Sequence, residues 1–517
     1  MALLTTDWTV DGLILISLSM SVIYFYMTRN YGYWKKLGVK ELSPTFFFGN
    51  VAPCIMAKQT PEQFIREVHQ KNKSERMVGF YVFDQPYLLL RDPELIKDVF
   101  IKDFHNFSNK ILTGNKRDPL GSKSVFLVRN PPWKYLRQKL SPIFTSGKLK
   151  RMFELMIEIC QDFDNHLDSL QIDEKVGKPI EIKELYAKFM TDLIGTTAFG
   201  MKLNSLTDPN AEFRKRGREM FRSSYKRYLE LMSILFIPSL RFLTNPKFFD
   251  ESGTKFLRES FWDVIHHRKT TGTKRSDLID LLIEMKKKQD EDPSDNYKLE
   301  GDDLVAQAAI FFSGGFETSS TTSSFALYEI AKNQKVQTRL RDEILTGLKK
   351  TDGKLTYELV TNLPYFDMVI QEALRMYPVL SWLDRTPDND YTFSGTGITV
   401  KKDTPIILPM RALHMDPNFF PDPETFDPER FSEANKKSIV PCSYFPFGEG
   451  PRNCIGGRLG MIQTRLALIK VISKYEVTHC KETISPMKFD NLNVVLNAPG
   501  GIYLNFRRIP ENEVMVR

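Results

Sequence analysis

From Tyr444 to Gly460 the sequence reads YFPFGEGPRNCIGGRLG, with one cysteine, Cys454, among several glycines. Apolar residues follow at helical spacing: Ile455, Leu459, Ile462, Leu466 and Ile469. This spacing predicts a helix whose amino end carries Cys454. Free N–H groups and the helix dipole stabilise negative charge at such an end, so a thiolate is favoured there.

The chemistry open to Cys454 is limited by its surroundings. The segment has no second cysteine or histidine with which to build a zinc or iron–sulfur site, but a lone thiolate can be the axial ligand of a haem iron. The neighbouring glycines let backbone N–H groups approach the sulfur and let a flat macrocycle approach the chain. The alternative is an inert, buried cysteine in a glycine-rich turn.

The pattern Phe447-x-x-Gly450-x-Arg452-x-Cys454-x-Gly456 matches the haem-binding signature of the cytochrome P-450 family at every fixed position. The chain therefore resembles that family, and Thr145–Lys150, Gly315–Ser320 and Pro421–Glu424 look most like insect microsomal members. The resemblance implies a mainly α fold with a small β portion (α+β). It also implies haem b held by the Cys454 thiolate as the metal ligand, with further contacts from Phe447 and Gly448.

A long apolar helix is predicted over Val305–Ala331, with Gly314 and Gly315 near its middle. Two glycines cost about 1 kcal/mol each relative to Ala, and a local loosening that admits O2 and water would explain them. The Thr318 hydroxyl can bond the Gly314 carbonyl or a ligand, and Glu317 can relay protons. This segment resembles the family's acid–Thr motif, which implies that Thr318 and Glu317 are catalytic.

A charge network is implied by two further segments. Glu372 and Arg375 lie three residues apart, on one helix face. Together with Pro428–Phe431 (PERF) they resemble the family's E-x-x-R and P-E-R-F segments. The implied role is structural, with Arg430 completing a network that holds the cysteine loop.

Four residues are implied as partners of the haem propionates. Trp133 and Arg137 stand one helical turn apart, and the resemblance adds Arg385 and Arg452. Arginine suits this place because it pairs with carboxylates through two hydrogen bonds. A surface charge is the alternative for Arg385.

The amino terminus carries an uncharged stretch, Gly12–Thr28. As a helix it spans about 26 Å, enough for a thin bilayer such as that of the endoplasmic reticulum. Acidic residues precede it and basic residues follow it, which places the amino terminus in the lumen and the rest in the cytosol. The positive stretch that a cleaved signal peptide needs is missing. A buried core helix is the alternative.

Composition indicates an ordinary globular protein for the remainder. The 38 Phe and 19 Tyr exclude a disordered chain, and a net charge of +8 over 517 residues does not suggest a nucleic-acid partner. The five scattered cysteines form no disulfide framework. We expect a membrane anchor over 1–30, a hinge or linker over 31–50 with fewer prolines than family members usually have, and a single haem-thiolate catalytic domain over 51–517.

Several local predictions can be compared with the structure. Strand-like runs occupy Val78–Leu90 and Tyr391–Leu408, and a helix over Arg275–Met285 has Ser276 as its expected N-cap. The apolar run Leu231–Leu243 is either core or a hairpin that touches lipid.

The leading functional hypothesis is an NADPH-dependent monooxygenase that inserts one atom of O2 into hydrophobic substrates, such as plant toxins, insecticides or endogenous lipophiles. The chain has no dinucleotide-binding glycine motif of its own, so a separate electron donor is implied. By family analogy the partners are NADPH–cytochrome P-450 reductase, cytochrome b5 as a further candidate, membrane lipid and a hydrophobic small molecule. The expected location is the endoplasmic reticulum membrane, single-pass, with the catalytic domain facing the cytosol.

A basic cluster is the candidate docking site for that donor: Lys134, Arg137, Lys139, Lys148, Lys150 and Arg151. Two other functions stay open, a donor-independent haem-thiolate isomerase or dehydratase and a non-catalytic haem or lipophile-binding protein. The resemblance implies substrate contacts near Phe107–Phe126, Leu203–Tyr228, Val379–Leu383 and Pro499–Ile502, which are largely apolar. Phe311, Phe312 and Phe316 either face the substrate or belong to the core.

Overall fold

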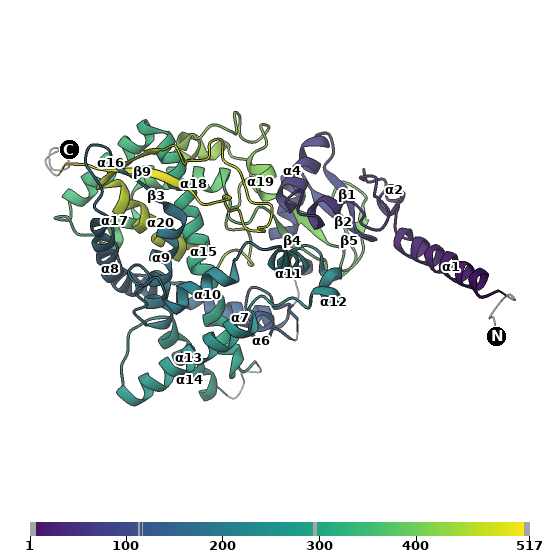
Figure 1. Cartoon of the computed structure of the whole chain (residues 1–517), viewed down its shortest axis with the longest axis horizontal. Helices are drawn as coiled ribbons and strands as arrows, with labels where there is room; N and C mark the ends of the chain where they lie inside the picture. The colour runs from purple at the N-terminus through teal and green to yellow at the C-terminus, as the bar shows by residue number, and fades with distance from the viewer. Residues whose placement is uncertain (1–6, 112–113, 116, 293–296, 511–517) are drawn as a thin grey trace.

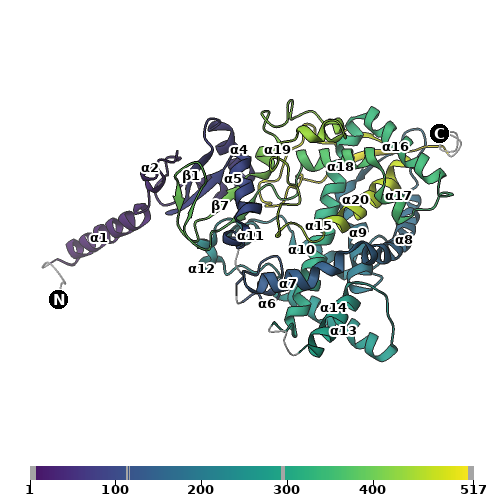
Figure 2. The ribbon, with the colours of Figure 1, turned by 180° about the vertical axis from the view of Figure 1, so that it is seen from behind.

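The computed structural model describes residues 7–111, 114–115, 117–292 and 297–510. A large helical body carries small sheets, and one helix, α1, projects from the end where β1 and β2 lie (Figures 1 and 2). The predicted α+β class is confirmed.

The helices up to the middle of the chain are α1 (Trp8–Thr28), α2 (Tyr33–Lys36), α3 (Ala52–Ile55), α4 (Pro61–Lys71), α5 (Pro93–Lys97), α6 (Pro119–Lys123), α7 (Pro132–Leu140), α8 (Ser146–Ser169), α9 (Ile182–Ile194), α10 (Glu212–Met220), α11 (Tyr225–Leu235), α12 (Arg241–Thr244) and α13 (Glu251–Thr271). The later helices are α14 (Leu278–Glu291), α15 (Asp302–Lys332), α16 (Gln334–Lys349), α17 (Tyr357–Thr361), α18 (Pro364–Met376), α19 (Met410–His414) and α20 (Gly457–Ile472).

The strands are β1 (Met77–Val82), β2 (Gln85–Leu90), β3 (Lys178–Glu181), β4 (Leu383–Arg385), β5 (Tyr391–Thr392), β6 (Thr399–Val400), β7 (Ile406–Leu408), β8 (Tyr475–His479) and β9 (Tyr503–Arg508). The two runs predicted as strand-like, Val78–Leu90 and Tyr391–Leu408, contain β1 from Val78 on, β2, β5, β6 and β7, whereas β3, β4, β8 and β9 lie outside them. The largest sheet has the order β1-β2-β7-β4, and the others pair β3-β9-β8 and β5-β6. In the largest sheet β4 runs antiparallel to β7 with Arg385 opposite Ile406, which fixes Arg385 on a rigid element.

Helix α15 forms the centre of the molecule and packs against α9, α6, α20 and α18. Its extent confirms the helix predicted over Val305–Ala331. It is helical without a break through Gly314 and Gly315, where a local loosening was expected. Gly315 instead lets the Ile194 side chain of α9 lie close to the α15 backbone: a Cβ there would be 2.5 Å from its Cδ1.

One local prediction differs from the structure, and one open alternative can be compared with it. The helix expected to start at Ser276 begins at Leu278, and its N-cap is Asp277, whose carboxylate accepts from the Asp280 N–H. Asp277 also pairs with Arg268, and this contact selects it over Ser276. In Leu231–Leu243 most apolar residues before Pro238 are buried against β1 and β2, which favours core there, whereas Leu243 is 70% exposed.

The amino-terminal helix α1 is the one described helix long and apolar enough to cross a membrane. Its apolar side chains are mostly exposed, which disfavours a core helix. The segment 31–50, predicted as a hinge or linker, lies against the largest sheet: Trp34 is fully buried, and Glu41 and Gly49 form bridges to β1.

Candidate active site

The loop that carries Cys454 is closed by backbone hydrogen bonds. The Cys454 N–H donates to the Phe447 carbonyl at 2.8 Å, and the Gly448 N–H donates to the Phe445 carbonyl at 2.8 Å. Helix α20 starts three residues after Cys454, so the predicted position at the amino end of a helix is confirmed. Gly450 has φ +70°, and a Cβ there would lie 1.9 Å from the Phe100 carbonyl oxygen, so the loop needs glycine at this position.

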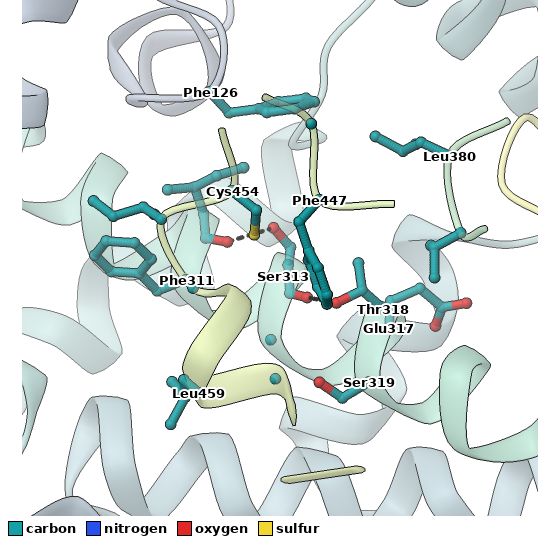
Figure 3. Close-up of a pocket in the computed structure, with 18 of the residues that line it drawn as sticks. Phe126, Phe311, Ser313, Glu317, Thr318, Ser319, Leu380, Phe447, Cys454 and Leu459 are labelled. Atoms are coloured by element: carbon teal, nitrogen blue, oxygen red, sulfur yellow. Dashed lines mark hydrogen bonds between the residues drawn. The ribbon is translucent and has the colours of Figure 1, made fainter. Parts of the chain in front are cut away.

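Cys454 opens into a cavity of about 350 Å³ inside the protein. Figure 3 shows Cys454 and Phe447 on one side and Thr318 and Glu317 of α15 close by. Enclosure by protein raises the pKa of the Cys454 thiol, while the Gly456 N–H and the charges of Arg137 and Lys110 oppose that rise. The helix end therefore does not make Cys454 a strongly acidic thiol by itself.

The pair predicted to handle protons, Thr318 and Glu317, lies on α15. The Thr318 hydroxyl donates to the Gly314 carbonyl at 2.6 Å, one of the two alternatives that the sequence leaves open. The Glu317 carboxylate accepts from Lys183 Nζ of α9 at 2.9 Å, and Lys183 also donates to the Ser320 hydroxyl. Both members of this ion pair are largely buried. Lys183 was not predicted, because it is 134 residues from Glu317 in the sequence.

All the predicted cofactor residues line the same cavity: Trp133, Arg137, Arg385, Phe447, Gly448, Arg452 and Cys454. Their local contacts differ. Arg137 donates to the backbone and the side chain of Asn453, both at 2.7 Å, so it grips the cysteine loop. Arg452 stacks on the Trp133 ring at 4.7 Å and donates to two backbone carbonyls. Arg385 is 1% exposed, which excludes the surface alternative.

One further cation in this group, Lys110, was missed by sequence reasoning. Its ammonium lies 4.2 Å from the centre of the Phe126 ring and is surrounded by protein. Burial and the nearby Arg452 and Arg385 lower its pKa to about 7, against the opposing effect of Asp384. No local motif around Lys110 signals this position.

The predicted charge network is present behind the cysteine loop. Arg375 donates to both oxygens of Glu372, at 2.7 and 2.8 Å, and both side chains are fully buried. Arg430 Nε lies 3.4 Å from Glu372 Oε1, so the two side chains form an ion pair, but Nε makes no hydrogen bond. Arg375 also donates to the carbonyls of His414 and Pro423, so the network ties α18 to the segment before the loop.

The cavity lining agrees with part of the substrate-contact prediction. Phe126, Phe221, Phe311, Val379 and Leu380 line it. Phe312 and Phe316 do not: both are fully buried and pack in an aromatic cluster with α10, so they belong to the core. Among the described residues, the predicted segment Pro499–Ile502 does not line the cavity, but the nearby Val494 and Val495 do.

The arrangement of a loop cysteine facing an acid–Thr helix agrees with the comparisons to known proteins. The sequence matches the family model described as Cytochrome P450 over residues 40–506. The chain is 40% identical to "Cytochrome P450 6k1" of Blattella germanica, with 96% of this chain and 97% of that protein covered. It is 39% identical to "Probable cytochrome P450 6g2" of Drosophila melanogaster (96% and 98% covered) and 37% identical to "Cytochrome P450 6a2" of the same species (96% and 99%). A match over nearly the full length, together with this geometry, means that the chain belongs to the cytochrome P450 family.

Proposed function

We propose that this protein is a membrane-anchored haem-thiolate monooxygenase that oxidises apolar substrates with electrons from NADPH, delivered by a separate reductase. The observation that supports this most is Cys454 facing an apolar cavity with Thr318 and Glu317 in its wall (Figure 3). Haem bound through a cysteine thiolate supplies the cleavage of the O–O bond. The protein's own residues hold the haem, orient the substrate and deliver protons.

The residues around Cys454 fit a haem group with two carboxylates. Lys110, Arg385 and Arg452 bring three basic groups together, with Asp384 as the nearby acid. Burial and neighbouring cations lower the pKa of Arg452 to about 9. Two carboxylates at this place would relieve that repulsion. They would also give an acceptor to Arg385 Nε, which is buried without a hydrogen-bond partner.

The cysteine loop has the task of holding sulfur in position. A thiol that coordinates a metal is deprotonated, so the raised pKa of free Cys454 does not prevent ligation. Arg137 stabilises the thiolate electrostatically and fixes the loop through Asn453. Trp133, Phe447 and Gly448 complete the contacts that we assign to the cofactor.

Proton delivery is assigned to Thr318 and Glu317. The hydrogen bond to Gly314 uses the Thr318 proton and leaves its oxygen free to accept a bond from a molecule in the cavity. The Glu317 carboxylate is held by Lys183, so it must leave this ion pair before it can carry a proton to Thr318. We infer that Glu317 alternates between Lys183 and the cavity.

The substrate class follows from the cavity wall. Aromatic and aliphatic side chains form most of it, and the polar groups gather near Cys454 and Thr318. Apolar surface of this kind favours hydrophobic molecules. Plant toxins, insecticides and endogenous lipophiles all fit this description.

The membrane and the electron donor complete the proposal. The apolar helix α1 and the basic residues after it support a single-pass anchor in the endoplasmic reticulum with the catalytic domain in the cytosol. For the reductase, exposed Lys134 and Arg151 make no ion pair within the described residues and suit an acidic partner. Lys148 and Lys150 are less suitable, because they pair with Glu284 and Glu358. Cytochrome b5 is a second acidic donor that could use the same face.

The reduced carbon monoxide difference spectrum of the full-length protein tests the core of this proposal. We expect a red-shifted Soret band in wild type and in Cys480→Ser, whose cysteine lies outside the cavity lining, and loss of that band in Cys454→His. A band typical of nitrogen-ligated haem in wild type, or no bound haem, would overturn the proposal. Substrate turnover without NADPH and reductase would favour the isomerase alternative.

A further inference from the structure

Lys110 is held in the cavity wall by a rigid part of the fold. On one side of it the Asn109 carbonyl accepts from the Thr386 N–H at 3.0 Å, and on the other the Ile111 N–H donates to the Asp384 carboxylate at 2.5 Å. Asp384 belongs to β4 and Thr386 follows that strand directly, so the largest sheet fixes the backbone around Lys110. The Lys110 side chain therefore starts from a fixed point, as a specific binding group requires.

The same side chain ends without a polar partner. Lys110 is only 8% exposed, and its ammonium makes no hydrogen bond or ion pair with the residues that the structure describes. It lies 4.2 Å from the centre of the Phe126 ring, whose face attracts a cation but is no substitute for an oxygen acceptor. An ammonium has three N–H donors, and leaving buried donors unused is costly. These donors are therefore available to a molecule that enters the cavity.

Beside the main cavity lies a second, smaller hollow, which we call the alcove. Its volume is about 30 Å³. Lys110, Phe126 and Leu380 line both the alcove and the main cavity, whereas Trp382 and Asp384 line the alcove alone. Phe126 and Leu380 mark this side of the cavity in Figure 3. A hollow of about 10–15 Å³ is enough for one water molecule, so the alcove has room for a small polar group but not for a ring.

The basic groups near the alcove favour a neutral ligand over an anionic one. Among the described residues, Arg385 and Arg452 line the main cavity only, and Lys110 is the basic group that reaches the alcove. These three basic groups are matched in number by Asp384 and the two carboxylates of the proposed haem, so no positive charge is left over for an anion. A neutral oxygen can accept from Lys110 without bringing a further charge next to Asp384.

We propose that the alcove is a binding subsite for a carbonyl oxygen of the substrate, which accepts a hydrogen bond from Lys110 while the apolar body of the molecule lies in the main cavity. This inference rests on the proposed function and names the substrate class of the same site: apolar ketones, esters and lactones. Lys110 is then a specificity-determining residue. By fixing one end of the substrate, it selects which carbon lies on the Cys454 side of the cavity.

Isothermal titration calorimetry with a matched pair of ligands tests the inference on the full-length holoprotein. Butyrophenone and butylbenzene have the same carbon skeleton and differ in the ketone oxygen. Lys110→Met keeps an unbranched side chain but removes the ammonium. It should raise the ratio of the butyrophenone Kd to the butylbenzene Kd about tenfold or more, as expected for the loss of a hydrogen bond to a charged group. Lys335→Met, at an exposed position on α16, is the matched control and should leave the ratio unchanged.

A second variant tests the alcove without removing Lys110. Val494 lines both the alcove and the main cavity, so Val494→Leu adds one carbon to the wall and narrows the alcove. It should raise the same ratio of dissociation constants, although the ammonium is present. In wild type the anionic 4-phenylbutyrate should bind more weakly than butyrophenone, and tighter binding of the anion would contradict the preference for a neutral oxygen.

The outcomes separate this inference from the proposed function. If wild type does not bind butyrophenone, or if Lys110→Met changes both dissociation constants by the same factor, Lys110 does not bind a substrate oxygen and the inference is overturned. The proposed function stands in that case if wild type has the thiolate band in its reduced carbon monoxide spectrum. Loss of haem from Lys110→Met would assign Lys110 to the haem carboxylates and also overturn the inference. Absence of the thiolate band in wild type would remove the proposed function and this inference together.

Discussion

Substituting Gly450 by alanine should dislodge the cysteine ligand, and the structure allows the size of the effect to be worked out. Two costs arise. At φ +70° any residue with a Cβ pays roughly 1–2 kcal/mol for the left-handed conformation. In addition, the Cβ would lie 1.9 Å from the Phe100 carbonyl oxygen, where real Cβ contacts are no shorter than 3.0 Å.

Relief of this overlap needs a movement of about 1.1 Å by the loop or by the Phe100 backbone. A functional site tolerates displacements of about 0.5 Å before its geometry is lost. Cys454 is four residues away, and its loop is fixed by the bond to Phe447. We therefore expect Gly450→Ala to lose haem or to bind it without the thiolate.

The control for this experiment is Gly397→Ala. Gly397 has nearly the same φ, +69°, but no heavy atom lies within 4 Å of the place its Cβ would take, and it does not line the cavity. Both variants pay the backbone cost, so their difference isolates the overlap with Phe100. The assay is the reduced carbon monoxide spectrum, normalised to haem content. Equal thiolate bands in the two variants would refute the reasoning.

Three other perturbations follow from the same structure. Thr318→Ala should keep the thiolate spectrum but divert electrons to peroxide, so that less product forms for each NADPH used. Thr318→Ser should restore the coupling of NADPH use to product formation. An unchanged ratio of product to NADPH in Thr318→Ala would count against the assigned role. Glu372→Gln leaves the buried Arg375 charge unpaired and should lower the free energy of unfolding by about 3–5 kcal/mol, seen as a lower guanidinium midpoint; a wild-type midpoint contradicts it. Lys134→Glu should slow reduction by the reductase at low salt. Lys335→Glu on α16 makes the same charge change away from α7 and should leave the reduction rate unchanged. Equal reduction rates for the two variants would contradict docking at Lys134.

The sequence predicts those parts of the site that depend on the backbone near a single residue. Cys454 needs glycines that accept positive φ, and Thr318 reaches a carbonyl four residues earlier, so both leave a local pattern. The long helix α15 likewise follows from apolar periodicity. The close approach of Ile194 from α9 to Gly315 could not be predicted, because the two residues lie far apart in the sequence.

Contacts between distant segments leave no such pattern. The Arg137 side chain donates a hydrogen bond to Asn453, which is 316 residues away in the sequence, and the Lys183 ammonium donates one to Glu317, which is 134 residues away. The N-cap at Asp277 illustrates the same limit. Ser and Asp are both good caps, so the sequence does not distinguish Ser276 from Asp277. The ion pair of Asp277 with Arg268, nine residues earlier on a different helix, favours Asp277. Lys110 was missed because a buried cation is recognised only by the charges that surround it.

The two sides of the cavity differ in how firmly they are held. Around the sulfur, two backbone hydrogen bonds close the loop, from the Cys454 N–H to Phe447 and from the Gly448 N–H to Phe445, and no side-chain rotation can open them. On the α15 side, Glu317 is held by Lys183, and both side chains have rotatable bonds that allow the pair to open. A metal ligand must stay in place throughout turnover, whereas a proton carrier has to move between a donor and an acceptor. This difference in attachment therefore supports separate tasks for Cys454 and Glu317, independently of the motifs in which they occur.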